Sequence, residues 1–155
     1  MNPQDFVLLA IEAVGGNVVG RAKLENIIFF AALHTDSLDM FRYRERDGVL
    51  HSRRVQDALD ALRKAGALAE YIDWRYCVAG GSMELSRHEF DVTYFGAEFA
   101  AGLRSDHKYA AVVQALDRCK GLLSWMLGVD DDILFGAAKN MFEKYRNECG
   151  LDQHG

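Results

Sequence analysis

The sequence predicts a mainly helical α+β fold that contains one β-hairpin. Apolar residues recur at intervals of three and four along most of the chain, which is the spacing of one face of an α-helix. Residues that favour helix ends stand where these periodic segments begin and stop. Between them, residues 71–92 carry strand-forming side chains on both sides of a glycine pair, a pattern typical of a hairpin.

The first two helices are predicted near the N-terminus. Pro3 can occupy the first turn without losing a hydrogen bond, and the pair Gly15-Gly16 supplies a left-handed cap. The second helix, over residues 22–34, is apolar almost all round. Such a helix lies at the centre of a domain or is shared with a partner chain.

A third helix and the hairpin follow. Ser52 is the predicted N-cap of the helix, and Gly66 ends it. The alternation of apolar residues changes phase along the second strand of the hairpin, which predicts a bulge near Arg87 or His88.

Three further helices are predicted after the hairpin. Thr93 caps a short helix that runs to Leu103. Longer helices cover residues 105–127 and 131–147, and the acidic residues at 130–132 suit the positive end of the last helix dipole.

The order of elements, three helices followed by a two-stranded wing, is that of a winged helix, a variant of the helix-turn-helix. We expect one domain over residues 1–150 with a frayed tail at 151–155. The winged-helix part covers about 4–103, and two additional C-terminal helices at about 105–147 should pack over the second helix.

Length and composition agree with one globular domain. The chain has 155 residues, of which 50% are hydrophobic and 26% charged. No apolar run approaches the ~18–20 residues of a membrane-spanning helix, and no basic region followed by an apolar stretch opens the chain. We therefore expect a cytoplasmic protein that does not contact a membrane.

The three cysteines, Cys77, Cys119 and Cys149, are odd in number and widely spaced. None belongs to a C-x-x-C pair or lies near a histidine at the spacing of metal ligands. They are expected to be free thiols in a reducing compartment.

Three segments carry a resemblance to a known family. Residues 20–30 read GRAKLENIIFF, residues 41–70 contain F-R-Y, S-x-x-V-x-x-AL-x-x-L-x-x-AG and L-A-E in this order, and residues 92–99 read VTYFGAEF. Together they resemble YwgA-like proteins, which are similar in turn to the Panacea-type domains of some antitoxins. The resemblance implies a winged-helix fold and a function either in DNA-binding regulation or in toxin binding.

The chain departs from the family pattern at two places. Glu25-Asn26 stand where the family has Gln-Lys, and Arg53-Arg54 stand where it often has acidic residues. The resemblance therefore does not choose between the two functions.

One basic segment stands inside an acidic chain. The net charge is −5, yet residues 42–64 contain seven basic and four acidic residues. An extended segment would place Arg42, Arg44 and Arg46 on one side because they alternate with other residues. Two more arginines stand in the first turn of the third helix, where a cation opposes the helix dipole, which points to a use in binding phosphate or carboxylate. The candidate binding residues are Arg42, Arg44, Arg46, Arg53, Arg54 and Lys64.

Two functions remain open. In the first, the protein is a non-enzymatic winged-helix protein that uses the basic segment to bind DNA. Asp57 and Asp60 on the third helix would repel phosphate, which argues against deep insertion of this helix into a groove. In the alternative, the protein is an interaction module, such as an antitoxin-like or adaptor subunit, and the basic segment meets an acidic protein partner.

No motif for catalysis, a cofactor or a metal stands out. The G-x-x-x-x-G of residues 15–20 lacks the lysine and the hydroxyl of a phosphate loop, and it is expected to be a helix–helix turn. His88-Glu89 begins like a zinc-protease motif, but Val92 stands where the second histidine would be. We expect no enzyme activity, no cofactor and no metal site.

Four apolar residues near the junction of the last two helices exceed what one small core requires: Trp125, Met126, Leu127 and Phe135. Exposed together, they would form a patch of the kind that marks an interface. We expect a homodimer through the C-terminal helices, which would also double the basic segment.

Overall fold

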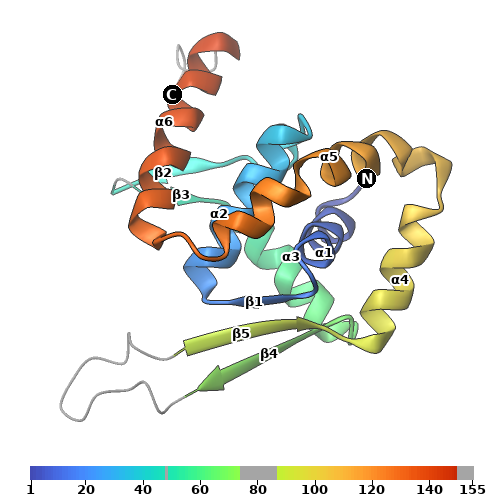
Figure 1. Ribbon diagram of the computed structural model, residues 1–155. Coiled ribbons are helices and arrows are strands. Elements are labelled where there is room, and N and C mark those ends of the chain that lie inside the picture. The colour runs from blue at the N-terminus through green and yellow to red at the C-terminus, as the bar shows by residue number, and fades with distance from the viewer. Residues whose placement is uncertain (48, 74–86, 150–155) are drawn as a thin grey trace.

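The computed structural model describes residues 1–47, 49–73 and 87–149. Helices predominate, and the strands form two separate antiparallel sheets (Figure 1). The predicted tail at 151–155, Cys77 and the side chain of Cys149 lie outside the described residues.

The first helix, α1 (Pro3–Ala13), begins and ends where its sequence predicts. The side chain of Asn2 accepts a hydrogen bond from the backbone N–H of Asp5 at 2.9 Å, which caps the first turn. Gly15 and Gly16 have φ angles of 102° and 82°, so the chain leaves the helix through a left-handed turn that favours glycine.

A short strand, β1 (Asn17–Val19), follows this turn and corrects the prediction of a plain helix–helix turn. Three residues are too few to show an alternation of apolar side chains, so periodicity could not reveal the strand. The next helix, α2 (Arg21–His34), lies at the centre and contacts α1, α5 and α6. This position explains why α2 is apolar almost all round and confirms that the C-terminal helices pack over it.

A second, small sheet separates α2 from the third helix. The 3-10 helix η1 (Leu38–Met40) leads to β2 (Arg44–Arg46) and β3 (Val49–His51), which pair with each other. α3 (Arg53–Lys64) then begins at Ser52, whose hydroxyl accepts a hydrogen bond from Val55 N at 3.2 Å. This N-cap is the predicted one.

The predicted hairpin is present as β4 (Leu68–Asp73) and β5 (Arg87–Val92). The two strands are antiparallel, with Leu68 opposite Val92 and Asp73 opposite Arg87, and β1 joins the other edge of β5. Every residue of β5 has one partner on β4, so the predicted bulge near Arg87 or His88 is absent. The change of phase that prompted it falls in residues 83–86, outside the described part of the chain.

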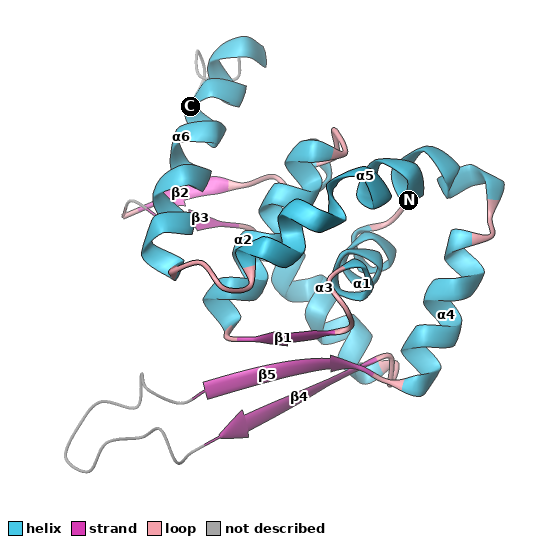
Figure 2. Cartoon of the chain, viewed as in Figure 1, coloured by secondary structure: helices cyan, strands magenta, loops and turns pink. Residues whose placement is uncertain are grey.

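The remaining helices are α4 (Tyr94–Arg104), α5 (Ala110–Met126) and α6 (Asp131–Cys149). A 3-10 helix, η4 (His107–Tyr109), precedes α5. Figure 2 shows α4 at one end of the molecule and the β2–β3 sheet beside α6 at the other.

The hydrophobic core joins these elements. Its largest fully buried side chains include Phe6 of α1, Phe29 of α2, Phe41 ahead of β2 and Phe90 of β5. None of the helices in the described residues is long and apolar enough to cross a membrane.

Candidate functional site

Five predicted arginines form an exposed group around the start of α3, which we call the basic surface: Arg42, Arg44, Arg46, Arg53 and Arg54. They come from the segment before β2, from β2 itself and from the first turn of α3. Helix periodicity could not place the arginines at 42–46 relative to those at 53–54, because the turn between β2 and β3 separates the two groups.

The β2–β3 sheet sets the direction of two of these side chains. Arg44 pairs with His51 and Arg46 pairs with Val49, so both arginines lie on the same face of the sheet. Glu45 lies between them and faces the other way, where its carboxylate is 3.3 Å from Lys139 on α6. The alternation thus places the two arginines on one face and the exposed Glu45 on the other, toward α6.

Three contacts hold the start of α3 against the segment before β2. The Ser52 hydroxyl donates to the carbonyl of Phe41 at 2.5 Å. The guanidinium of Arg54 donates to the carbonyl of Met40 at 3.1 Å. Since His51 also pairs with Arg44, residues 40–44 lie beside residues 51–54, which brings Arg42 and Arg44 near Arg53 and Arg54. Arg46 lies two residues further along β2, on the same face as Arg44.

The charges of the basic surface are largely uncompensated. Within residues 1–47, 49–73 and 87–149, no carboxylate forms an ion pair with any of its five arginines. Elsewhere in the molecule, Arg21 and Arg63 bind Glu70, and Arg104 binds Asp117. Exposed cations without partners are available to a ligand.

Lys64 does not belong to this group. It is exposed but lies at the last position of α3, eleven residues after Arg53, which corresponds to roughly 16 Å along a helix. The sequence analysis named it as a candidate binding residue because it belongs to the same basic segment, and the structure places it apart from the five arginines.

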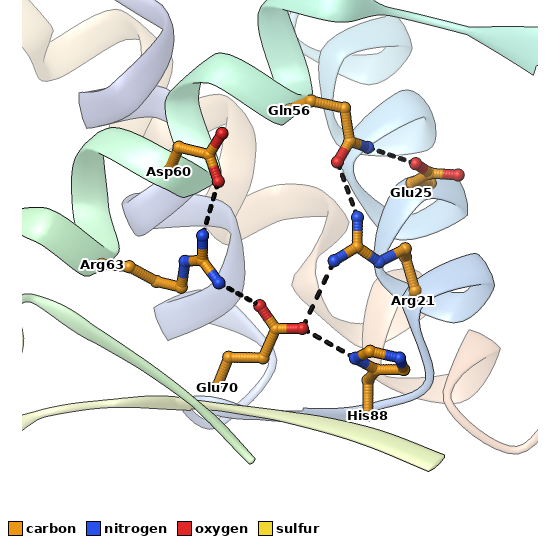
Figure 3. A network of polar contacts seen from close by, with 7 residues as sticks. All are labelled: Arg21, Glu25, Gln56, Asp60, Arg63, Glu70 and His88. Atoms are coloured by element: carbon orange, nitrogen blue, oxygen red, sulfur yellow. Dashed lines mark hydrogen bonds and ion pairs between the residues drawn. The ribbon is translucent and has the colours of Figure 1, made fainter. Parts of the chain in front are cut away.

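A second polar cluster, which sequence analysis missed, fixes α3 against the hairpin (Figure 3). The Glu70 carboxylate on β4 accepts from Arg63 of α3 at 2.9 Å, from Arg21 of α2 at 3.3 Å, and lies 2.7 Å from His88 of β5. Burial opposes ionisation of Glu70, but the hydrogen bond to His88 and the charges of both arginines outweigh it and lower the pKa of Glu70.

This cluster continues along α3. Arg63 also binds Asp60 at 2.7 Å, and Arg21 donates to the side-chain oxygen of Gln56 at 2.9 Å. Because Asp60 is neutralised in part by Arg63, only Asp57 of the two acidic residues on the exposed face of α3 lacks an arginine among the described residues.

The predicted dimer residues are divided by the structure. Trp125 is 66% exposed, but Met126 is only 2% exposed and packs in the core, which corrects the expectation that it contributes to a surface patch. Leu127 and Phe135 are half-buried. Met126 continues the buried stripe of α5 formed by Leu116, Cys119 and Leu123, a spacing that periodicity could have shown.

A different apolar surface lies on α4 and was not predicted. Tyr94, Phe95 and Phe99 are 82%, 52% and 45% exposed. The rings of Phe95 and Phe99, one helical turn apart, lie 6.3 Å from each other. The hairpin aromatic residues Trp74 and Tyr76 lie outside the described residues.

The described part of the chain contains no group of three or more side chains that could hold a metal ion. Comparisons with known protein families, with curated proteins and with solved structures find no match to this chain.

Proposed function

We propose that the protein is a winged-helix protein that binds DNA through the basic surface. The order of elements supports the fold assignment: α1, β1, α2 and α3 precede the β4–β5 hairpin, and the sheet order is β1-β5-β4. In this assignment, the β2–β3 sheet is an insertion directly before α3, the helix that corresponds to the recognition helix.

The observation that carries the proposal is the grouping of five exposed arginines at the start of α3. Arg53 and Arg54 oppose the dipole of α3, at a cost of about 0.3–1 kcal/mol each in stability. An anion placed at the same end would reverse this penalty, since it interacts favourably with both the arginines and the helix N-terminus.

The geometry favours contact with the phosphate backbone over reading of bases. Asp57 and Asp60 lie on the exposed face of α3 and would repel phosphates that approach the middle of the helix. The arginines instead lie at one end of α3 and on the adjacent β2–β3 sheet. We therefore expect affinity that depends strongly on salt and weakly on sequence.

The test measures binding to a short fluorescent DNA duplex by anisotropy between about 50 and 200 mM salt. With five phosphate contacts, the logarithm of affinity should fall with the logarithm of salt with a slope of about −4 to −5. The double variant Arg53→Ala/Arg54→Ala should weaken binding and make the slope less steep by about 2. Its melting temperature should change little, because the removal of two cations from a helix N-terminus offsets the loss of the exposed hydrogen bond from Arg54 to the carbonyl of Met40.

The matched control removes the same charge from another surface. Arg118 and Lys120 are exposed on α5, and the double variant Arg118→Ala/Lys120→Ala should leave the slope unchanged. Equal losses in both double variants would show an effect of net charge alone. A slope near zero in the unaltered protein would rule out DNA binding by this surface.

The exposed aromatic residues of α4 favour a second function, that of a protein-interaction module. Tyr94, Phe95 and Phe99 belong to α4, and this helix lies at the far end of the molecule from the β2–β3 sheet (Figure 1). Exposed aromatic side chains are common at protein interfaces. This function gains support if DNA binding is absent and a nuclease-treated pull-down from the native host retains a protein that Phe95→Ser/Phe99→Ser releases.

A further inference from the structure

A small pocket lies between α2, β3, the start of α3 and α6. It encloses about 330 Å³ counted to its open mouth, and its closed part has room for about one water molecule. Phe29, Tyr43 and Phe135 supply aromatic walls, and Glu25 supplies a carboxylate. The pocket involves none of the five arginines of the basic surface, so what it binds does not depend on the proposed DNA binding.

Tyr43 brings an unsatisfied polar atom to this pocket. Its hydroxyl is buried and has no hydrogen-bond partner in the described residues. The ring is held by an edge contact with Phe29 at 5.1 Å and a tilted contact with Phe41 at 6.0 Å. Burial of a hydroxyl without a partner is unfavourable, so a ligand or a water molecule that bonds to it would stabilise the folded protein.

Glu25 brings a carboxylate that forms no ion pair with any described residue. The amide of Gln56 donates to one of its oxygens, whereas the nearby guanidinium of Arg21 is bound to Gln56 and Glu70. Burial raises the pKa of Glu25, and the charges of Arg21 and His51 and the Gln56 hydrogen bond offset this only in part. A cation in the pocket would supply the missing compensation.

Ser52 also lines the pocket, and its existing hydrogen bonds narrow the choice of ligand. The Ser52 hydroxyl is fully engaged, since it donates to Phe41 and accepts from Val55. The groups left for a ligand are thus the Tyr43 hydroxyl, which can accept, the Glu25 carboxylate, and the side-chain oxygen of Asn26, whose amide nitrogen donates to the carbonyl of Ala22. Glu25 would repel an anion. A neutral alcohol would leave the negative charge of Glu25 uncompensated.

We propose that this pocket binds the protonated amino group of a small primary amine. A primary ammonium group is close to a water molecule in size, so it fits the closed part, while its alkyl chain lies along the mouth. Its N–H donors match the acceptor oxygens of Tyr43 and Glu25, and aromatic residues of the kind that attract cations, Phe29 and Phe135, line the same pocket.

The test is calorimetric titration of the intact protein at neutral pH with n-butylammonium chloride, against n-butanol and sodium chloride. Saturable binding is expected for n-butylammonium only. Tetramethylammonium, which is larger and has no N–H donor, should bind more weakly. Glu25→Gln should reduce the affinity for n-butylammonium by at least about tenfold.

Tyr43→Phe gives a second readout that does not depend on the charge of Glu25. This substitution removes the unsatisfied hydroxyl, so the variant should melt at a higher temperature than the unaltered protein when no amine is present. Addition of amine should raise its melting temperature by less than that of the unaltered protein. The control Glu98→Gln removes an exposed carboxylate on α4 and should bind like the unaltered protein.

Three outcomes would overturn the proposal. The first is equal binding of n-butanol and n-butylammonium, which would show an apolar pocket. The second is unchanged amine affinity in both Glu25→Gln and Tyr43→Phe. The third is absence of saturable binding, which would leave the space to an ordered water molecule; neither this result nor the others bears on DNA binding.

Discussion

Glu70 shows how a single carboxylate ties four elements of this protein together. It lies on β4 and contacts side chains from α2, α3 and β5. Its side chain is 6% exposed, whereas Arg21 and Arg63 are nearly half exposed. The arginines are thus still hydrated, and removal of the carboxylate leaves no fully buried charge behind.

Replacing this carboxylate by an amide tests its contribution. Glu70→Gln should lower the free energy of unfolding by about 1–3 kcal/mol, because charge-assisted hydrogen bonds to two arginines and a histidine are weakened. Chemical denaturation measures this. Glu98→Gln, on exposed α4, should change stability by less than about 0.5 kcal/mol.

The same variant should change the pH dependence of stability. The pKa of Glu70 is lowered in the folded protein from its ordinary value of 4.5, so the unfolded chain binds the proton more tightly. The contribution of Glu70 is therefore complete above the ordinary value and is lost as pH falls through the lowered one. The stability difference between unaltered protein and Glu70→Gln should shrink on acidification; a constant difference would contradict the assignment.

At the scale of single residues, the sequence predicts which side chains are exposed better than it predicts which side chains contact each other. The outward direction of Arg44 and Arg46 follows from alternation, and the structure has them on one face. The partners of Glu70 and the pocket around Tyr43 involve residues from several elements, so no local pattern contains them. Met126 was misplaced because its neighbours in sequence were grouped without regard to the helical face.

At the scale of elements, α4 approaches the residue before β4 closely. Of the described glycines, Gly96 of α4 leaves the least room for a side chain. A Cβ at Gly96 would lie 2.1 Å from the carbonyl oxygen of Ala67. That oxygen accepts the backbone N–H of Thr93, whose hydroxyl caps α4 through the N–H of Gly96. The packing and the cap therefore depend on the same few atoms.

Alanine at two glycines of α4 should have opposite effects. Gly96→Ala should destabilise the protein by at least about 2 kcal/mol, because the backbone of Ala67 must move. Gly102→Ala meets no atom within 4 Å and should stabilise it by roughly 0.5–1 kcal/mol through helix propensity. Thermal unfolding compares the pair, and equal effects of the two substitutions would count against the contact.

The helices were predictable because their end signals are local. Ser52 and Thr93 cap α3 and α4 as their sequence indicates, and the Asp130 carboxylate accepts the backbone N–H of Asp132 at 2.8 Å at the start of α6. β1 was not predictable, because its residues pair with residues of β5 far along the chain, such as Asn17 with Asp91. Pairing over such separations leaves no local trace.

At the scale of the whole molecule, exposed apolar side chains on α5 and on α4 are open to a partner. On α5, Leu122 and Trp125 are 42% and 66% exposed. The predicted homodimer uses the side chains on α5. The buried position of Met126 restricts that interface to the outer side of α5.

Light scattering at tens of micromolar protein tests the dimer. We expect a mass of twice the 17.4 kDa of one chain. Leu122→Ser/Trp125→Ser should reduce the mass to that of one chain, because it removes apolar area from the interface. Tyr94→Ser/Phe95→Ser, on α4, should leave it unchanged, and a single-chain mass for the unaltered protein would refute the dimer.

Lys23 has a consequence for how the protein is made. This lysine is buried on α2, and its ammonium group is held by the carbonyl of Val129 and, at 3.0 Å, by the carboxylate of Asp131. Val129 lies 106 residues further along the chain. A ribosome releases the N-terminal part first, and burial of a charge without its counter-ion is unfavourable. We therefore expect the central helix to reach its native packing only once translation has passed the start of α6.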